Sequence, residues 1–444
     1  MSDVDPPRRA AYDVLAAVRD RDAYVNLTLP ALLRERRITG RDAAFATELT
    51  HGTVRRQGSY DAVIDSLATH ALDPRVRDVL RLGTHQLLGM RTPKHAAVAT
   101  SVDLARAVAG ERPVRLVNAV LRKVSAKDMN AWMDAVAPPR AKDLLGHLAV
   151  RHSHPRWVVE AMSEALDGDE SQLEALLTAD NDPPQVALVA RPGRASVDEL
   201  LRDGAGPGSW SPYAAAWPGG DPGTVAAVRE GRAAVQDEGS QLAALALARA
   251  EVSGRDERWL DVCAGPGGKA ALLAALASER GARLLAADVQ GHRAGLVRQS
   301  LRGASGAVGI VVADGRRPAW GEHDRVLVDA PCTGLGALRR RPEARWRRQA
   351  SDLDGLVPLQ RALLEKALDS CRGGGVVVYA TCSPVRAETR GVVDAVTTSR
   401  DDVVEEDARV LLSGVPDLGS GPHVQLWPHR HRTDAMFVAL LRRR

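Results

Sequence analysis

The stretch Asp261-Val262-Cys263-Ala264-Gly265-Pro266-Gly267-Gly268-Lys269-Ala270 decides the fold of this chain. The mainly apolar residues 259–262 predict a buried strand, the glycines allow a sharp turn, and the alanine-rich segment 270–277 predicts a helix. A strand that turns directly into a helix leaves free backbone N–H groups at the carboxyl end of the strand. Open α/β sheets bind adenosyl or dinucleotide ligands at that position, so residues 263–269 form a candidate cofactor loop.

The turn by itself is compatible with more than one cofactor. Gly265, Gly267 and Ala270 satisfy the dinucleotide pattern, and Asp288 ends the next apolar run, where an acid suits ribose hydroxyls. A nicotinamide enzyme would look the same here. A nucleoside triphosphate loop is less suitable, because Cys263 replaces its first glycine and Ala270 replaces the Ser or Thr that holds magnesium.

Composition and charge limit the possible classes of protein. A length of 444 residues predicts two or three domains, and the net charge of +4 permits a nucleic-acid partner without requiring one. Residues 1–20 are polar and no run of 18 apolar residues occurs, so we expect a cytoplasmic protein with no membrane contact. The four cysteines form no C-x-x-C pair, so we expect neither a metal site nor disulfides.

Hydrophobic periodicity divides the chain into three regions. Residues 6–135 have apolar side chains at helical spacing and predict an all-α bundle, whereas 140–235, after a Pro-Pro break, predict a small connecting α+β region. In 236–444, strands and helices alternate, which predicts a Rossmann-like, mainly parallel sheet. The expected strands are 258–262, 283–288, 308–313, 325–329 and 375–380, the helices are 269–279, 291–302, 355–371 and 386–398, and 424–427 with 436–441 would add an antiparallel hairpin.

Two strands of this predicted sheet end in cysteine motifs. One reads Val328-Asp329-Ala330-Pro331-Cys332, and the other reads Val378-Tyr379-Ala380-Thr381-Cys382. Carboxyl ends of parallel strands lie at one edge, so both motifs can meet a ligand held by the glycine turn. A dehydrogenase needs no such thiols.

Methylation of cytosine at C5 does need thiol chemistry. C5 is a poor nucleophile until a thiolate adds to C6, after which C5 can take a methyl group from S-adenosylmethionine. A second group must then remove the C5 proton so that the thiol can leave. An acid near N3, a position that suits Asp329, would stabilise the charge that develops on the ring.

These motifs resemble those of the Nol/Sun (Fmu) group of RNA cytosine-C5 methyltransferases. In addition, Leu49-x-x-Gly52-x-x-Arg55, Leu80-Arg81-Leu82-Gly83 and Val117-Asn118-Ala119-Val120-Leu121-Arg122 resemble the NusB-type RNA-binding fold. Together the two resemblances cover nearly the whole chain, which is most similar to the bacterial members that act on 16S ribosomal RNA. They imply that S-adenosylmethionine is the cofactor, that RNA is the partner and that the protein is an enzyme; we expect a monomer.

The resemblance also implies residue roles. Cys382 would be the attacking thiol and Cys332 would assist product release. The loop from Cys263 through Ala264, Gly265, Pro266, Gly267 and Gly268 to Lys269 would bind the cofactor, together with Asp288 at the ribose, Asp314 near the adenine and Asp329 near the methyl group and base.

A cluster of basic residues lies between the two cysteine motifs. Residues 338–348 contain six arginines and one tryptophan, and we expect contacts to RNA phosphates or bases from Arg339, Arg340, Arg341, Arg345, Trp346 and Arg347. Two other functions stay open: a methyltransferase acting on transfer RNA, and a non-catalytic NusB-like RNA-binding or antitermination factor.

Overall fold

The computed structural model of the protein describes residues 4–444, so the first three residues of the polar N-terminal stretch lie outside it. The chain forms two compact units. One comprises the chain up to Asp182 together with Leu338–Arg348, and the other comprises Pro183–Ala337 and Gln349–Arg444. The predicted connecting region 140–235 is divided between the units at residue 182, so that its first three helices join the first unit, whereas its strands and two later short helices join the second.

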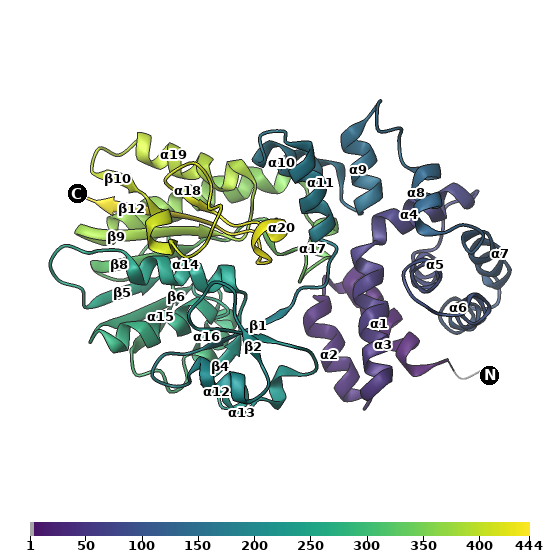
Figure 1. The fold of residues 1–444 in the computed structure, drawn as a ribbon, viewed down its shortest axis with the longest axis horizontal. Helices are drawn as coiled ribbons and strands as arrows, with labels where there is room; N and C mark the ends of the chain where they lie inside the picture. Colours follow the sequence, from purple (N-terminus) through teal and green to yellow (C-terminus); the bar gives the residue numbers. More distant parts are fainter. Residues whose placement is uncertain (1–3) are drawn as a thin grey trace. The chain divides into compact units, whose positions relative to one another are not determined.

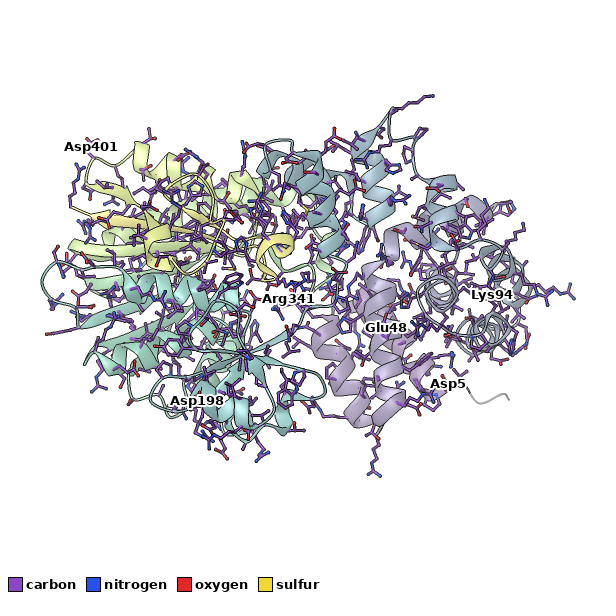
Figure 2. The ribbon with its side chains drawn as sticks, viewed as in Figure 1. Asp5, Glu48, Lys94, Asp198, Arg341 and Asp401 are labelled. Carbon is purple, nitrogen blue, oxygen red and sulfur yellow. The ribbon has the colours of Figure 1, made fainter. Side chains whose placement is uncertain are left out.

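The first unit is helical, as Figure 1 shows. Its core is formed by buried side chains such as Leu49, Leu80 and Leu121, and charged side chains such as Glu48 and Lys94 are exposed (Figure 2). Its helices are α1 (Pro6–Arg21), α2 (Val25–Glu35), α3 (Gly40–Arg55), α4 (Gln57–Leu67), α5 (Pro74–Leu88), α6 (Lys94–Ala109), α7 (Val114–Val124), α8 (Met129–Val136), α9 (Leu144–His152), α10 (Arg156–Ala165), α11 (Glu170–Ala179) and, from the later segment, α17 (Ala344–Arg347).

The second unit contains a small antiparallel sheet and a large mixed sheet. The small sheet has the order β2 (Gly206–Pro207), β3 (Ala214–Trp217), β1 (Val186–Ala190), β4 (Ala233–Val235). The large sheet has the order β10 (Val403–Glu406), β12 (Phe437–Arg443), β9 (Cys371–Thr381), β8 (His323–Asp329), β5 (Arg258–Asp261), β6 (Arg283–Asp288), β7 (Ala307–Val312), with β11 (Val424–Gln425) paired to β12. Strands β5 to β9 pair in parallel, and β10, β11 and β12 add antiparallel strands.

Helices cover both faces of the large sheet, which confirms the predicted Rossmann-like α/β domain (Figure 1). Successive strand residues alternate between the faces, so Leu327 packs under α14 (Glu238–Arg249) and α15 (Gly268–Glu279), whereas Val326 and Val328 pack under α18 (Leu353–Asp369). The helices of this unit are α12 (Val197–Arg202), α13 (Ala226–Arg229), α14 (Glu238–Arg249), α15 (Gly268–Glu279), α16 (Gly291–Ser300), α18 (Leu353–Asp369), α19 (Arg390–Thr398) and α20 (Pro428–His431).

The predicted elements are confirmed with shifts of a few residues at their ends. The terminal hairpin forms, with Val424 opposite Val438. Strand β10 was not predicted. The predicted helix 355–371 was too long at its end, because Cys371 already begins β9, where the backbone pairs with His323 of β8.

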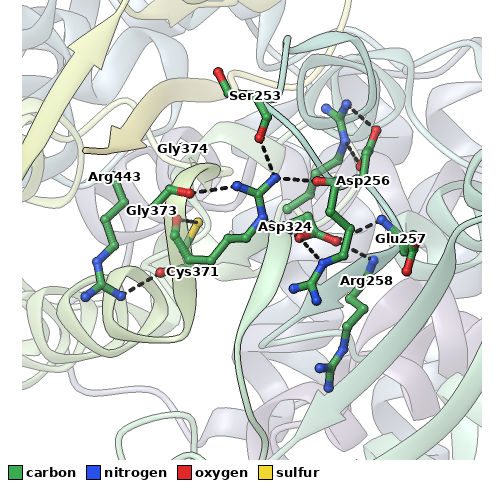
Figure 3. A network of polar contacts seen from close by, with 12 residues as sticks. Ser253, Asp256, Glu257, Arg258, Asp324, Cys371, Gly373, Gly374 and Arg443 are labelled. Atoms are coloured by element: carbon green, nitrogen blue, oxygen red, sulfur yellow. Dashed lines mark hydrogen bonds and ion pairs between the residues drawn. The ribbon is translucent and has the colours of Figure 1, made fainter.

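A buried carboxylate holds the amino-terminal end of the large sheet (Figure 3). Asp324 is inaccessible to solvent and accepts hydrogen bonds from the backbone N–H groups of Glu257 and Arg258, both 2.8 Å, and from the side chains of Arg255 at 3.1 Å and Arg372 at 2.6 Å. Burial alone would raise the pKa of Asp324, but these four donors outweigh it and lower the pKa. The network joins β5, β8 and β9 at the end of the sheet opposite to Cys332 and Cys382.

Within residues 4–444, none of the helices is both long enough and apolar enough to cross a lipid bilayer.

Candidate functional site

The glycine turn after β5 is shaped around a carboxylate. The backbone N–H of Gly265 donates to Asp288, at the end of β6, over 3.0 Å, and a Cβ at position 265 would lie 2.5 Å from that carboxylate oxygen. Gly267 has φ of 114°, which side chains rarely adopt, and immediately precedes α15. The turn therefore requires glycine at both positions, and it brings the start of α15 and Asp288 to one edge of the sheet.

The two predicted ribose and adenine acids have different surroundings. Asp288 is 4% exposed, and its second oxygen accepts the N–H of Gln290 at 2.9 Å. Asp314 follows β7 and is partly exposed, and its carboxylate pairs with Arg316 at 2.7 Å. The hydrogen bonds from Arg316 lower the pKa of Asp314. Asp314 is therefore ionised and held at the end of β7.

Lys269 points from the first turn of α15 to the end of β8. Its Nζ atom lies 2.9 Å from a carboxylate oxygen of Asp329. Burial acts to lower the pKa of Lys269, but the charge and hydrogen bond of Asp329 outweigh burial and raise it. The glycine turn and the first cysteine motif are thus joined by an ion pair.

The two cysteines at the ends of β8 and β9 lie together. The Sγ atoms of Cys332 and Cys382 are 3.5 Å apart, although 49 residues separate them in the sequence. The hydrogen bond from Cys332 is the main cause that lowers the pKa of Cys382, and Lys269 lowers it further. The same hydrogen bond, with burial and the charge of Glu388, raises the pKa of Cys332. Cys382 is therefore the thiol that ionises first.

The other two cysteines differ from this pair. Burial raises the pKa of Cys263, which lies in the candidate cofactor loop, and raises the pKa of Cys371 to about 12. Both are therefore protonated thiols at neutral pH. Their environments do not activate them.

The basic segment 338–348 belongs to the helical unit, which corrects part of the sequence prediction. Arg345 is fully buried, and its guanidinium donates to the carbonyl of Ser153 at 2.9 Å and to the side chain of Asn181 at 3.0 Å. Burial lowers the pKa of Arg345 to about 9. The predicted contact of Arg345 with RNA is wrong, because its donors already bind protein carbonyls.

The remaining members of the segment are divided between packing and exposure. The Trp346 indole packs against Gly58, and the Arg347 guanidinium lies 4.9 Å from the Tyr24 ring centre. Arg341 is exposed (Figure 2). RNA contacts by Arg339, Arg340, Arg341, Trp346 and Arg347 stay predictions.

Two acids near the thiols were not identified from the sequence. Asp261 ends β5 and is inaccessible to solvent, and burial raises its pKa to about 8. Glu388 is also fully buried and bonds to residues beside both cysteines. Asp261 was quoted in the decisive stretch without a role, and Glu388 carries no signal in a single sequence.

Comparison with known proteins identifies the family of the chain. Residues 249–442 match the family model described as 16S rRNA methyltransferase RsmB/F, and residues 5–126 match the NusB family. The chain is 32% identical to the ribosomal RNA small subunit methyltransferase B of Pseudomonas putida, with 88% of each chain covered. The chain belongs to the RsmB/F methyltransferase family. The resemblance to this family and the predicted NusB-like N-terminal domain are confirmed.

Two other similarities extend over almost the whole chain. The Mycobacterium tuberculosis protein named "Putative methyltransferase Rv1407" is 53% identical, with 99% of this chain and 97% of that protein covered. The crystal structure titled PH0851 has a TM-score of 0.80 at 23% identity and covers 99% of both chains, which supports the fold. At the level of the family, the chain is an S-adenosylmethionine-dependent RNA methyltransferase.

Proposed function

We propose that this protein methylates C5 of a cytosine in 16S ribosomal RNA, with S-adenosylmethionine as the methyl donor and a transient covalent bond between Cys382 and C6 of the base. The observation that supports this most directly is the pair of thiols 3.5 Å apart, whose pKa values are shifted in opposite directions. A single thiolate beside a protonated thiol suits a reaction that needs a nucleophile first and a proton acceptor later.

The residues around the glycine turn fit S-adenosylmethionine. Asp288 ends the second strand, where an acid suits two ribose hydroxyls, and each of its oxygens accepts one backbone N–H, which leaves further acceptor capacity. The N-terminus of α15 and the Lys269 ammonium suit a carboxylate such as that of the methionyl group. When bound there, the cofactor would supply a methyl group on a sulfonium.

In the proposed reaction, the chain's own residues do the following. The Cys382 thiolate forms a bond to C6 of the cytosine, and the electron pair of the C5–C6 double bond becomes available at C5. Asp329 lies at the strand end beside Lys269, and a proton shared between its carboxyl group and N3 would neutralise the negative charge that develops on the ring. After C5 has accepted the methyl group, Cys332 first loses its own thiol proton to water and then, as a thiolate, takes the C5 proton. The S–C6 bond then breaks, and Cys382 leaves as a thiolate.

Two variants of similar size test these roles. Cys382→Ala should abolish methyl transfer to 16S ribosomal RNA while S-adenosylmethionine still binds, as measured by calorimetry. Cys332→Ala should accumulate a covalent protein–RNA species that migrates slowly in a denaturing gel. Turnover by Cys382→Ala, or the absence of the slow species with Cys332→Ala, would contradict the assignment.

Bisulfite sequencing identifies the substrate. We compare ribosomal and transfer RNA from the unmodified strain, from a deletion strain, and from the deletion strain carrying the Cys382→Ala gene. In the last two, one cytosine of 16S ribosomal RNA that resists bisulfite conversion in the unmodified strain should be converted. Loss of a protected cytosine in transfer RNA instead would transfer the assignment to that substrate. No change in either RNA would favour the non-catalytic RNA-binding function.

A further inference from the structure

A buried carboxylate connects the two loops that carry the cysteines. Glu388 lies in the turn after β9, and its side chain is inaccessible to solvent. One carboxylate oxygen accepts the backbone N–H of Thr333 at 2.7 Å and the Gln360 amide at 3.0 Å. The other oxygen accepts the hydroxyls of Thr333 at 2.5 Å and Ser383 at 2.6 Å.

These partners are the immediate neighbours of the thiols in the sequence. Thr333 follows Cys332, and Ser383 follows Cys382, so one carboxylate holds both loops. The Gln360 amide also donates to the carbonyl of Pro331, on the other side of Cys332, at 2.8 Å. The first cysteine is therefore held from both sides.

The backbone of Glu388 is also held to the sheet. The Tyr379 hydroxyl, fully buried in β9, donates to the backbone carbonyl of Glu388 at 2.7 Å. A backbone hydrogen bond from Gly336 to the carbonyl of Cys382, 2.9 Å long, adds a second link between the two loops. Loops that extend beyond paired strands have no ladder hydrogen bonds of their own, so such side-chain links set their spacing.

We propose that Glu388 is a positioning residue that sets the Cys332–Cys382 separation. Its catalytic consequence rests on the proposed function, because only a reaction that uses both thiols on one base needs them at a fixed distance. Without the carboxylate, the Thr333 and Ser383 loops lose their common acceptor, and the distance between the two sulfur atoms is no longer fixed.

The first test needs neither RNA nor cofactor. Diamide removes two electrons and two protons from a neighbouring thiol pair and leaves a disulfide, and the rate depends on how well the two sulfur atoms are placed. We expect Glu388→Ala to form the Cys332–Cys382 disulfide about ten-fold or more slowly than the unmodified protein, as measured by mass spectrometry of the linked peptides. Glu388→Gln keeps the shape, and its amide can donate to the two hydroxyls, so it should restore most of the rate.

A matched control separates this role from local stability. Thr389→Val alters the next residue, which is also buried and whose hydroxyl bonds only to carbonyls of its own turn, those of Val385 and Arg386. It should leave disulfide formation unchanged. If Glu388→Ala does not fold, as judged by circular dichroism, Ser383→Ala removes one of the four contacts to Glu388, together with the direct 3.1 Å contact between the Ser383 and Thr333 hydroxyls, and should slow the reaction several-fold. A rate equal to that of the unmodified protein in the folded variant would overturn the proposal.

The second test uses the reaction. Glu388→Ala should lower kcat, leave the affinity for S-adenosylmethionine unchanged, and accumulate the slow protein–RNA species expected for Cys332→Ala. If Cys332→Ala yields no such species, the proposed function fails while the disulfide rates still test Glu388. If Cys332→Ala yields it and Glu388→Ala turns over at the unmodified rate, the positioning role is wrong and the proposed function stands.

Discussion

The acidity of Cys382 can be tested by removing the thiol that supports it. In Cys332→Ala the hydrogen bond across the 3.5 Å separation is lost, and this bond is the largest cause that lowers the pKa of Cys382. Three charges also act on Cys382: Lys269 lowers its pKa, whereas Asp329 and Asp434 raise it. We therefore expect Cys382 to become less acidic in the variant.

The size of the effect follows from the strength of one hydrogen bond. We take this hydrogen bond to stabilise the Cys382 thiolate, relative to the protonated thiol, by about 1 kcal/mol, since a thiol is a weak donor whereas the accepting thiolate is charged. That free energy changes the thiolate population about five-fold. At a pH where most Cys382 is protonated, its alkylation should therefore become about five-fold slower, because the thiolate is the reactive form.

The assay is iodoacetamide labelling of the free protein at a series of pH values, with the peptide that contains Cys382 quantified by mass spectrometry. The control is Cys371→Ala, which removes a buried thiol at the start of β9 and should not change the labelling of Cys382. The reciprocal variant, Cys382→Ala, should speed the labelling of Cys332, whose pKa the same hydrogen bond raises. Equal or faster labelling of Cys382 in Cys332→Ala would refute the reasoning.

Three other variants test the cofactor loop and the two units separately. Asp288→Asn should weaken S-adenosylmethionine binding about ten-fold or more in calorimetry, since an amide cannot accept from two backbone N–H groups and two hydroxyls; an unchanged Kd would contradict this. Asp324→Asn should lower the free energy of unfolding by about 3 kcal/mol, or the Tm by about 6–12 °C. This difference should shrink below about pH 4, because a carboxylate with a lowered pKa stabilises the fold only while it is ionised. Glu230→Gln, at an exposed carboxylate, is the control. Arg345→Met should likewise lower the Tm of the helical unit, whereas exposed Arg341→Ala should not, and equal Tm values would contradict the structural role of Arg345.

The sequence predicted the parts of the site that depend on local rules. A glycine with positive φ at 267, an acid at the end of β6 and cysteines at the ends of two parallel strands can each be placed from residue type and strand order. The distance between the sulfur atoms could not be predicted. It depends on how the loops after β8 and β9 pack together through Glu388.

The basic segment shows why charge patterns alone mislead. Arg345 and Arg341 occur in the same run of arginines, yet one is fully buried and the other is exposed. The partners of Arg345 are Ser153 and Asn181, far away in the sequence, and they supply the oxygens that make burial of a guanidinium tolerable. Only the tertiary structure shows which of the two arginines is buried and which is exposed.

The thiol pair gives Cys332 two successive states in the proposed reaction. Before attack, its proton stabilises the Cys382 thiolate, and that interaction together with burial raises the pKa of Cys332. Once the sulfur of Cys382 is bonded to C6 it carries no negative charge, so the main cause of the raised pKa disappears. Cys332 then becomes more acidic at the step in which a base must take the C5 proton. A fixed sulfur–sulfur distance, held by Glu388, couples these two states, because the hydrogen bond that activates the first thiol also keeps the second one protonated until the first has reacted.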